Sequence, residues 1–185
     1  EGETFPITAL AQVGQKVWIG SAGAGLARIT LEDQSITVFD QRAHPTTIIS
    51  NTITGLAAGD GQVWASTPFG ITRYDGTSFL PFIGPENGLP SLQVNDIKYG
   101  DGTFFVGTSS GLAHCNVNEG CRTGQTLDLN DNGLPATLGT DYIHALAYLN
   151  GNVWLSLAVS PQCPRGCLLR RNADPTDLND VDIIR

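Results

Sequence analysis

The sequence predicts an all-β protein: a β-propeller of four four-stranded antiparallel blades, forming a single domain over residues 1–185. Three observations predict this fold. A segment of about 45 residues recurs four times, a period typical of propeller blades. Its apolar runs are short, which suits strands better than helices. The chain also contains 22 glycines and 10 prolines, which disfavour helices and suit tight turns.

Each copy of the repeat contains an apolar strand, a tight turn and a strand with a central aromatic residue. A third strand then begins near a glycine. The aromatic residues are Trp18, Trp64, Phe105 and Trp154. The expected blades cover about 7–50, 51–91, 92–140 and 141–185. One such sheet cannot bury both of its faces alone, so we expect the blades to stack with these aromatic residues as wedges between them.

Turn residues join the first two strands of each copy. They are Gly14, Asp60-Gly61, Asp101-Gly102 and Asn150-Gly151. Asp-Gly and Asn-Gly readily adopt the positive φ angles of two-residue hairpins, so these strands are expected to pair. A fourth strand is predicted in each copy, at Ser35–Phe39, Ser78–Phe82, Gln125–Leu129 and Val181–Arg185.

These motifs resemble the two-component regulator propeller repeat. Its Asn-Gly-Leu-Pro loop is matched at 87–90 and 132–135, and its two following strand motifs at 17–20, 105–108 and 70–76. The sequence departs from the pattern at 44–50 in copy one and in a cysteine-containing insertion in copy four. The resemblance implies a propeller, often in the periplasmic sensory part of a signalling protein, and implies no catalytic residues.

Four blades leave the closure of the propeller open. The chain could form a self-contained ring, belong to a larger propeller, or be a half that forms a homodimer. The spacing of the repeats does not decide among these alternatives.

The four cysteines form two close pairs, Cys115 with Cys121 and Cys163 with Cys167. Each pair lies at an expected hairpin connection, where two Cα atoms can approach as closely as a disulfide requires. We therefore predict two local disulfides and an extracellular or periplasmic location. A zinc site and buried free thiols are the alternatives.

The composition argues against several partner classes. The formal net charge of −8 gives little electrostatic support for nucleic-acid binding. No apolar run is long enough to span a bilayer, so membrane insertion is not expected. Residues 128–133 resemble the start of a calcium loop, but Gly139 stands at its twelfth position, where an acidic ligand is needed. We therefore expect no metal and no cofactor.

Ligand binding is predicted at the end of the propeller opposite the hairpin turns, where loop length varies. The candidates are Phe69, Tyr142, His144 and Arg165. His144 also stands at the repeat position of Thr8, Thr54 and Asn95, which could form a polar collar around the axis. Hydrogen bonding to channel water or to the backbone is the role expected for this collar.

No arrangement of Ser, His and Asp and no pair of carboxylates points to catalysis, so no catalytic residue is predicted. The expected function is a non-enzymatic exported recognition or sensor module that binds a protein or a small polar ligand, such as a glycan. The alternatives are a lyase or hydrolase with its site in the axial channel, and a structural piece of a larger or dimeric propeller.

Overall fold

The computed structural model describes all residues except 1–3, 118–119, 122–141, 162, 173–180 and 185. The described residues form four antiparallel sheets of four strands each, and in every sheet the strands follow one another in chain order. Within this part of the chain, no helix is long and apolar enough to cross a membrane.

Each sheet corresponds to one copy of the repeat and is called a blade here. Blade 1 contains β1 (Ile7–Val13), β2 (Lys16–Ser21), β3 (Leu26–Thr30) and β4 (Ile36–Phe39). Blade 2 contains β5 (Gly55–Gly59), β6 (Gln62–Thr67), β7 (Gly70–Tyr74) and β8 (Phe79–Ile83). A 3-10 turn, η1 (Pro85–Asn87), follows. Blade 3 contains β9 (Val94–Gly100), β10 (Thr103–Thr108), β11 (Gly111–Asn116) and β12 (Gly120–Cys121). Blade 4 contains β13 (Ile143–Leu149), β14 (Asn152–Leu157), β15 (Cys167–Asn172) and β16 (Val181–Ile184).

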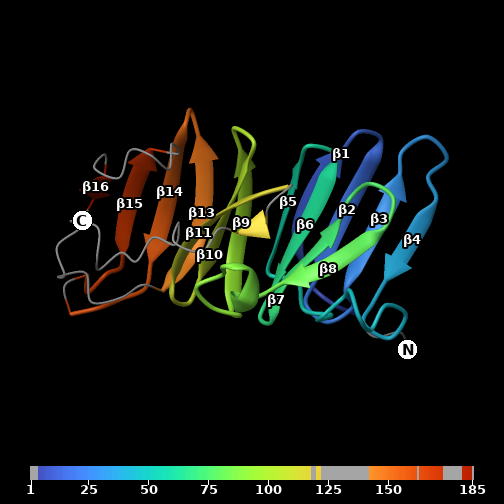
Figure 1. Cartoon of the computed structure of the whole chain (residues 1–185), viewed down its shortest axis with the longest axis horizontal. Helices are drawn as coiled ribbons and strands as arrows, with labels where there is room; N and C mark the ends of the chain where they lie inside the picture. The colour runs from blue at the N-terminus through green and yellow to red at the C-terminus, as the bar shows by residue number, and fades with distance from the viewer. Residues whose placement is uncertain (1–3, 118–119, 122–141, 162, 173–180, 185) are drawn as a thin grey trace.

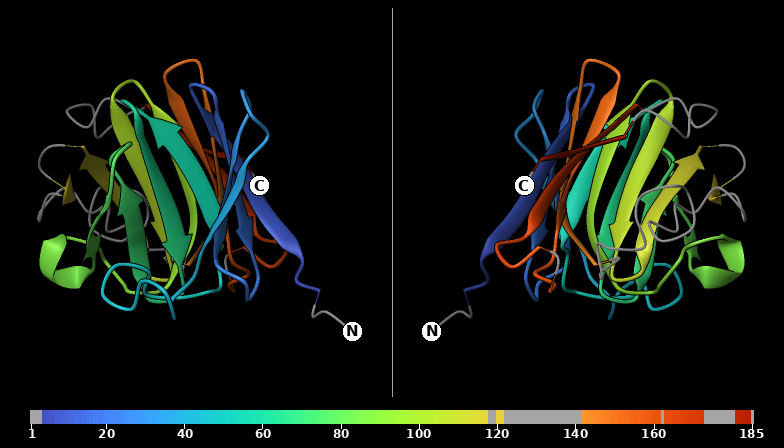
Figure 2. Two further views of the ribbon diagram at one scale, coloured as in Figure 1. Left: turned by 90° about the vertical axis from the view of Figure 1, so that its right-hand side faces the viewer. Right: turned by 90° about the vertical axis from the view of Figure 1, so that its left-hand side faces the viewer.

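The blades follow one another in a row, from blade 1 on the right of Figure 1 to blade 4 on the left. Their first strands lie side by side, β1 next to β5, β5 next to β9 and β9 next to β13. Viewed from either end of the row, the sheets lie behind one another (Figure 2). In the described residues no strand of blade 1 packs along a strand of blade 4. One face of each terminal blade is therefore left without a neighbouring blade.

The hairpin turns have the predicted geometry. Asp60, Asp101 and Asn150 have φ angles of 48°, 47° and 51°, and the glycine after each also has a positive φ. Two successive residues with positive φ give a turn whose twist matches that of the paired strands. The turns lie at the upper end of the blades in Figure 1, so the connections from second to third strands lie at the lower end.

Three hydrophobic clusters fill the spaces between consecutive blades. An aromatic pair lies in each: Trp18 with Tyr74 at a centroid distance of 4.8 Å, Trp64 with Phe104 at 4.1 Å, and Phe105 with Tyr148 at 5.6 Å. Trp18, Trp64 and Phe105 are completely buried. The prediction of an aromatic wedge between blades is confirmed for these three.

Trp154 differs from its three repeat equivalents, because it is only partly buried. It pairs across the sheet with Arg170, as Trp18 pairs with Arg28. Trp18, however, is covered by blade 2, whereas no strand of the described residues packs on the outer face of blade 4. The sequence predicts four equivalent buried aromatic residues. Trp154 is less buried than the other three because it lies at the end of the row of blades.

The fourth strand of blade 3 is shorter and earlier than predicted. It consists of Gly120–Cys121 and pairs with the end of β11. The predicted strand at 125–129 lies outside the described residues, as does the calcium-like segment at 128–133. The other fourth strands, β4, β8 and β16, lie within one residue of their predicted positions.

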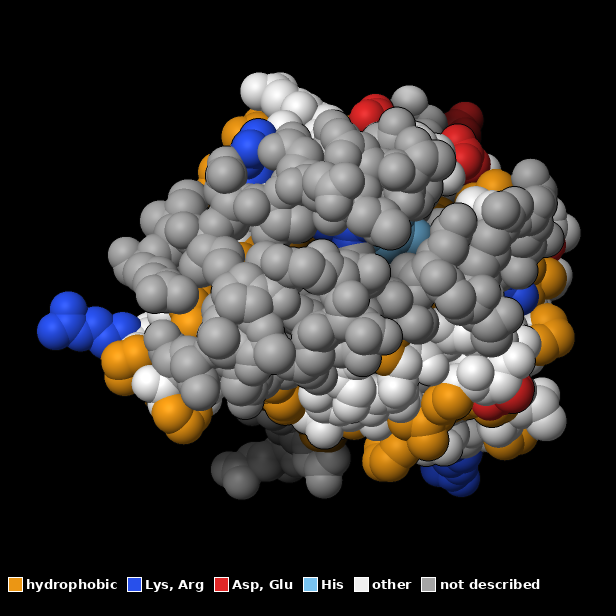
Figure 3. Space-filling view, turned by 60° about the vertical axis from the view of Figure 1, so that its left-hand side comes forward, with side chains coloured by type: hydrophobic (Ala, Val, Ile, Leu, Met, Phe, Trp, Pro, Cys, Tyr) orange, Lys and Arg blue, Asp and Glu red, His pale blue; other side chains and the backbone are white. Residues whose placement is uncertain are grey.

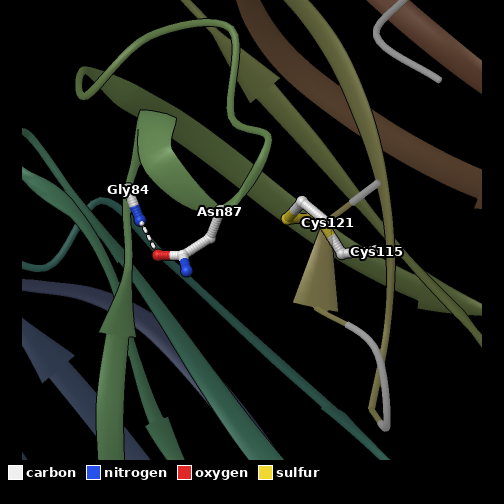
Figure 4. Close-up of a disulfide and its surroundings, with 4 residues drawn as sticks. All are labelled: Gly84, Asn87, Cys115 and Cys121. Atoms are coloured by element: carbon white, nitrogen blue, oxygen red, sulfur yellow. Dashed lines mark hydrogen bonds between the residues drawn. A yellow bond between two sulfur atoms is a disulfide. The ribbon is translucent and has the colours of Figure 1, made fainter. Parts of the chain in front are cut away.

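Both predicted disulfides are present, Cys115–Cys121 and Cys163–Cys167. The first joins directly opposed residues of β11 and β12. It lies near the turn of η1, where the backbone N–H of Gly84 donates to Oδ1 of Asn87 at 3.1 Å (Figure 4). All four cysteines are buried in the clusters between blades. The first bridge therefore fixes the edge strand of blade 3, and the second closes the connection between β14 and β15 of blade 4.

Candidate ligand site

The predicted ligand residues lie at the end of the row that carries the connections from second to third strands. Phe69 occupies the turn between β6 and β7 and is 59% exposed. The hydroxyl of Thr67 fixes this turn by accepting from the Phe69 N–H at 3.0 Å. Phe69 belongs to blade 2, whereas the other three candidates belong to the start and third-strand connection of blade 4.

Tyr142 packs beside His144, and His144 shares a hollow with Arg165. The rings of Tyr142 and His144 lie 4.9 Å apart. The Tyr142 hydroxyl accepts from Nε2 of Gln93 at 3.0 Å, which ties it to blade 3. His144 and Arg165, both exposed, line one hollow of about 480 Å³ with Ser156 and the disulfide-bonded Cys167. Three of the four candidates thus share a region, and their contact with a ligand stays a prediction.

The expected polar collar proves to be a set of bonds between blades. Thr8 donates to the carbonyl of Ile53 at 2.7 Å, and Thr54 donates to that of Val94 at 2.8 Å. Nδ2 of Asn95 donates to the Ile143 carbonyl at 2.7 Å. In each pair the donor belongs to one blade and the acceptor lies at or just before the start of the first strand of the next. These side chains therefore bond to the backbone, the second role expected for the collar.

A second hollow, of about 610 Å³, lies between blades 1 and 2 and is not predicted by the sequence. It is lined by aromatic rings, hydroxyl groups and two basic side chains. The lining includes Arg28, Phe39, His44, Thr46, Tyr74, Ser78 and Phe79. A concave site with aromatic walls and a few polar groups is the usual form of a small-molecule site.

The segment after β4 builds one wall of this second hollow. The His44 ring lies 5.7 Å from that of Phe39 and 5.4 Å from that of Phe79. The backbone carbonyl of Thr47, in the same segment, accepts from the hydroxyl of Thr72 in β7 at 3.2 Å. The segment is thereby held against blade 2. Copy one departs from the loop pattern at 44–50, which is the sequence signal that could have identified this wall.

Arg28 supplies positive charge in the lining of the second hollow. Its guanidinium carbon lies 5.8, 5.3 and 5.9 Å from the ring centres of Trp18, Phe39 and Tyr74. Its Nη1 also donates to the Tyr74 hydroxyl at 3.1 Å. Cation–π contacts of this kind hold the guanidinium in place. The charge is therefore oriented before any ligand arrives.

His114 is the buried histidine of the described chain and lies between blades 3 and 4, only 4% exposed. Its ring packs edge-on against Phe105 at 5.0 Å, and neither ring nitrogen has a hydrogen-bond partner. Burial, with the positive charge of Arg171, lowers the pKa of His114 to about 4. It is therefore a neutral packing residue at physiological pH and has no access to a substrate.

The part of the chain that the structure describes contains no group of three or more His, Cys, Asp or Glu side chains able to hold a metal ion. One ion pair is formed there, between Nζ of Lys98 and Oδ1 of Asp96 at 2.6 Å. The other Asp96 oxygen accepts from the Leu146 N–H at 2.8 Å. Asp96 thus links the first strands of blades 3 and 4.

No protein-family pattern and no curated protein sequence matches the chain. Solved structures do match it. One is described as the extracellular domain of a hybrid two-component system, BT4673 from B. thetaiotaomicron; it is 14% identical, covers 97% of this chain and 22% of its own, and has a TM-score of 0.66. The corresponding domain of BT3049 is 18% identical over 97% of this chain and 28% of its own, with a TM-score of 0.54.

Two other similar structures come from different settings. The WD40 repeats of RRP9 are 12% identical, with a TM-score of 0.67 over the whole of this chain and 52% of that one. The computationally designed Ika4 protein is 19% identical, with a TM-score of 0.61 over 93% of this chain and 94% of its own. The chain spans between about a fifth and about half of the natural proteins named here. At these identities the likeness shows the fold alone: stacked four-stranded sheets of the propeller type.

Proposed function

We propose that the chain is a non-enzymatic recognition module of an exported, sensor-type protein, and that it binds a small polar ligand in the hollow between blades 1 and 2. The observation that carries this proposal is the lining of that hollow. Rings of Phe39, Tyr74 and Phe79 stand beside the guanidinium of Arg28 and the imidazole of His44. Apolar walls with a few fixed polar groups are what small-ligand sites require.

A saccharide is the ligand class to test first. The C–H face of a sugar ring packs on aromatic side chains, and its hydroxyl groups pair with hydroxyl and guanidinium groups. The hollow offers both kinds of surface, with Thr46, Thr77 and Ser78 as the hydroxyl donors and acceptors. An acidic sugar would gain further from the charge of Arg28.

The proposed absence of catalysis follows from the same lining, which includes no acidic residue and no cysteine. A lyase or hydrolase needs a base or nucleophile held within reach of the reacting atoms. His44 contacts two aromatic rings instead.

Export is supported by the two disulfides, since such bonds persist in oxidising compartments. The extracellular domains of two-component systems that share this fold support a sensory role. We propose an extracellular or periplasmic location on these grounds.

Phe69, Tyr142, His144 and Arg165 form the second location proposed for ligand contact. The hollow shared by His144 and Arg165 favours it. Phe69 would contribute only to a ligand long enough to reach from blade 4 to blade 2, such as an extended chain.

The experiment is a binding screen of the folded chain against neutral and acidic oligosaccharides, followed by calorimetry on two matched variants. His44→Ala removes an imidazole from the hollow between blades 1 and 2, and His144→Ala removes one from the hollow of blade 4. We expect His44→Ala to weaken binding at least tenfold and His144→Ala to leave it unchanged. Loss in His144→Ala alone would transfer the site to blade 4, and no binding by any saccharide would refute the ligand class.

A further inference from the structure

We infer that the free faces of blades 1 and 4 form an interface between two copies of this chain, in which blade 1 of each copy packs on blade 4 of the other. This inference goes beyond the proposed function and does not rest on it. The reason is that the two free faces are the complementary halves of a junction that the chain already forms three times.

Each internal junction buries an apolar residue at the same position of the repeat. Val94 and Ile143 begin the first strands of blades 3 and 4, and Ile53 lies two residues before the first strand of blade 2; all three are completely buried against the preceding blade. A leucine or isoleucine three positions later is also buried in each blade: Leu56, Ile97 and Leu146. The equivalent residues of blade 1 are Ile7 and Leu10, which are 65% and 63% exposed.

The preceding blade offers a small residue to receive this side chain. A Cβ atom placed on Gly20 would lie 2.6 Å from Cγ2 of Ile53, and one on Gly107 would lie 2.7 Å from Cγ2 of Ile143. The equivalent residue of blade 4 is Ser156, which is exposed and lines the hollow of about 480 Å³. This hollow is thus the fourth socket, and Ile7 is the side chain without one. In the dimer Ile7 of the second copy would fill the hollow, so the ligand location proposed at blade 4 would be open only in the monomer.

His144 fits the same scheme. Its equivalents Thr8, Thr54 and Asn95 each donate to the carbonyl of the residue that begins the next blade. His144 is exposed and lies beside the socket. In the proposed interface its imidazole N–H donates to the carbonyl of Ile7 in the second copy, which completes the series.

The rest of the blade 1 face is apolar across all four strands except for Gln12, which pairs with Val17 at the edge of the sheet. Directly paired residues share one face of a sheet, so Leu10, Ile19, Ala27 and Val38 form one row across it. Val17, Ile29 and Ile36 form the next. Ile36 and Val38 are 67% and 61% exposed, and none of these side chains is charged. A continuous apolar face of this kind marks an interaction surface.

Blade 4 also exposes hydrophobic side chains; Figure 3 turns this side of the molecule toward the viewer and shows hydrophobic side chains around the residues drawn in grey. Leu168 is 40% exposed and Val159 68% exposed, and both line the socket. Trp154 is partly exposed and points away from blade 3. Trp18, its equivalent, points toward blade 2, away from the free face of blade 1. The second copy would give it the cover that its three equivalents have.

We infer that a second copy of the chain covers both free faces, because each copy has both halves of the junction: the side chains of blade 1 and the socket of blade 4. Two copies therefore form two identical junctions and leave no free face. Four strands about 4.8 Å apart and roughly 18 Å long give a face of about 350 Å². Two junctions cover four such faces, on the order of 1,400 Å², which is the size of a stable interface.

Sedimentation equilibrium of the folded chain tests this inference, and we expect a dimer. Leu10→Lys places a charge in the junction and should shift the mass to that of a monomer, with the circular dichroism spectrum unchanged. The matched control is Leu31→Lys, since Leu31 is 45% exposed but follows β3 in the turn to β4. A wild-type monomer at every concentration, or a Leu10→Lys variant that stays dimeric, would overturn the inference.

A cysteine pair tests the register of the junction. The ideal Cβ of Gly20 lies 3.0 Å from that of Ile53, so the equivalent atoms of Ser156 and Ile7 should approach closely between copies. The double variant Ile7→Cys/Ser156→Cys should run as a disulfide-linked dimer on a non-reducing gel, whereas Leu31→Cys/Ser156→Cys should not. A bond within one chain would show instead that four blades close on themselves, and no bond at all would refute the packing.

Discussion

The burial of His114 makes the stability of the protein depend on pH in a direction that can be worked out. The pKa of His114 in the folded state is about 4, well below the ordinary 6.5. Between these two values the unfolded chain binds a proton that the folded chain does not. The free energy of unfolding is therefore at its full value above pH 6.5 and decreases as the pH falls toward 4.

The size of the effect follows from the difference between the two pKa values. About 2.5 pKa units at 1.36 kcal/mol each correspond to roughly 3 kcal/mol lost once the pH is below both. At pH 5.5 the loss should be about 1.4 kcal/mol and at pH 4.5 about 2.5 kcal/mol by the same relation. A loss of this size is a large share of the stability of an ordinary domain.

Urea denaturation at pH 7.5, 5.5 and 4.5 measures this loss, with His114→Leu as the comparison. The variant removes the titrating group, while every carboxylate titrates alike in both proteins and cancels in the difference. If the wild type and His114→Leu lose stability in parallel as the pH falls, the pKa of His114 is not lowered in the folded protein.

Three further predictions concern the core, the disulfides and the turns. Trp64→Ala should lower the free energy of unfolding by about 3 to 5 kcal/mol, since it empties a fully buried site. Trp154→Ala should lower it by less than half as much, when both are compared by urea denaturation in the Leu10→Lys background. Equal losses would contradict the finding that the outer face of blade 4 is uncovered. Denatured, non-reduced protein should take up no alkylating reagent and reduced protein four equivalents, as counted by mass spectrometry. Gly151→Ala should cost about 1 to 2 kcal/mol in the same denaturation assay, because a φ of 71° strains any side chain there, although a Cβ would meet no other atom.

Much of the fold could be predicted because its signals are local. Asp60-Gly61, Asp101-Gly102 and Asn150-Gly151 specify hairpins through their own backbone preferences. Trp18 and Trp64 recur at matched positions, so their burial follows from the repeat. The short β12 was missed because a bridge between Cys115 and Cys121 fixes its register, and no hydrophobic alternation marks a two-residue strand.

The candidate sites were less predictable because they depend on which blades become neighbours. Thr8 and Thr54 look like channel-lining polar residues in sequence, but the stacking directs them to backbone carbonyls. The hollow beside Arg28 exists because the segment carrying His44 folds against Phe79 of the next blade. No periodic pattern in the sequence records such a contact between blades.

The row of blades also determines how the protein would come apart. Because each blade contacts only its neighbours, its stability is close to a sum of nearest-neighbour terms, as in a one-dimensional lattice. Among the described residues, blades 2 and 3 pack on two neighbours each, whereas blades 1 and 4 pack on one. Fraying would therefore start at both ends and move inward, and amide protons of β1 and β13 would exchange before those of β5 and β9. In a dimer the free faces of blades 1 and 4 would all be covered. Opening any blade would then require breaking its contacts with two neighbouring blades.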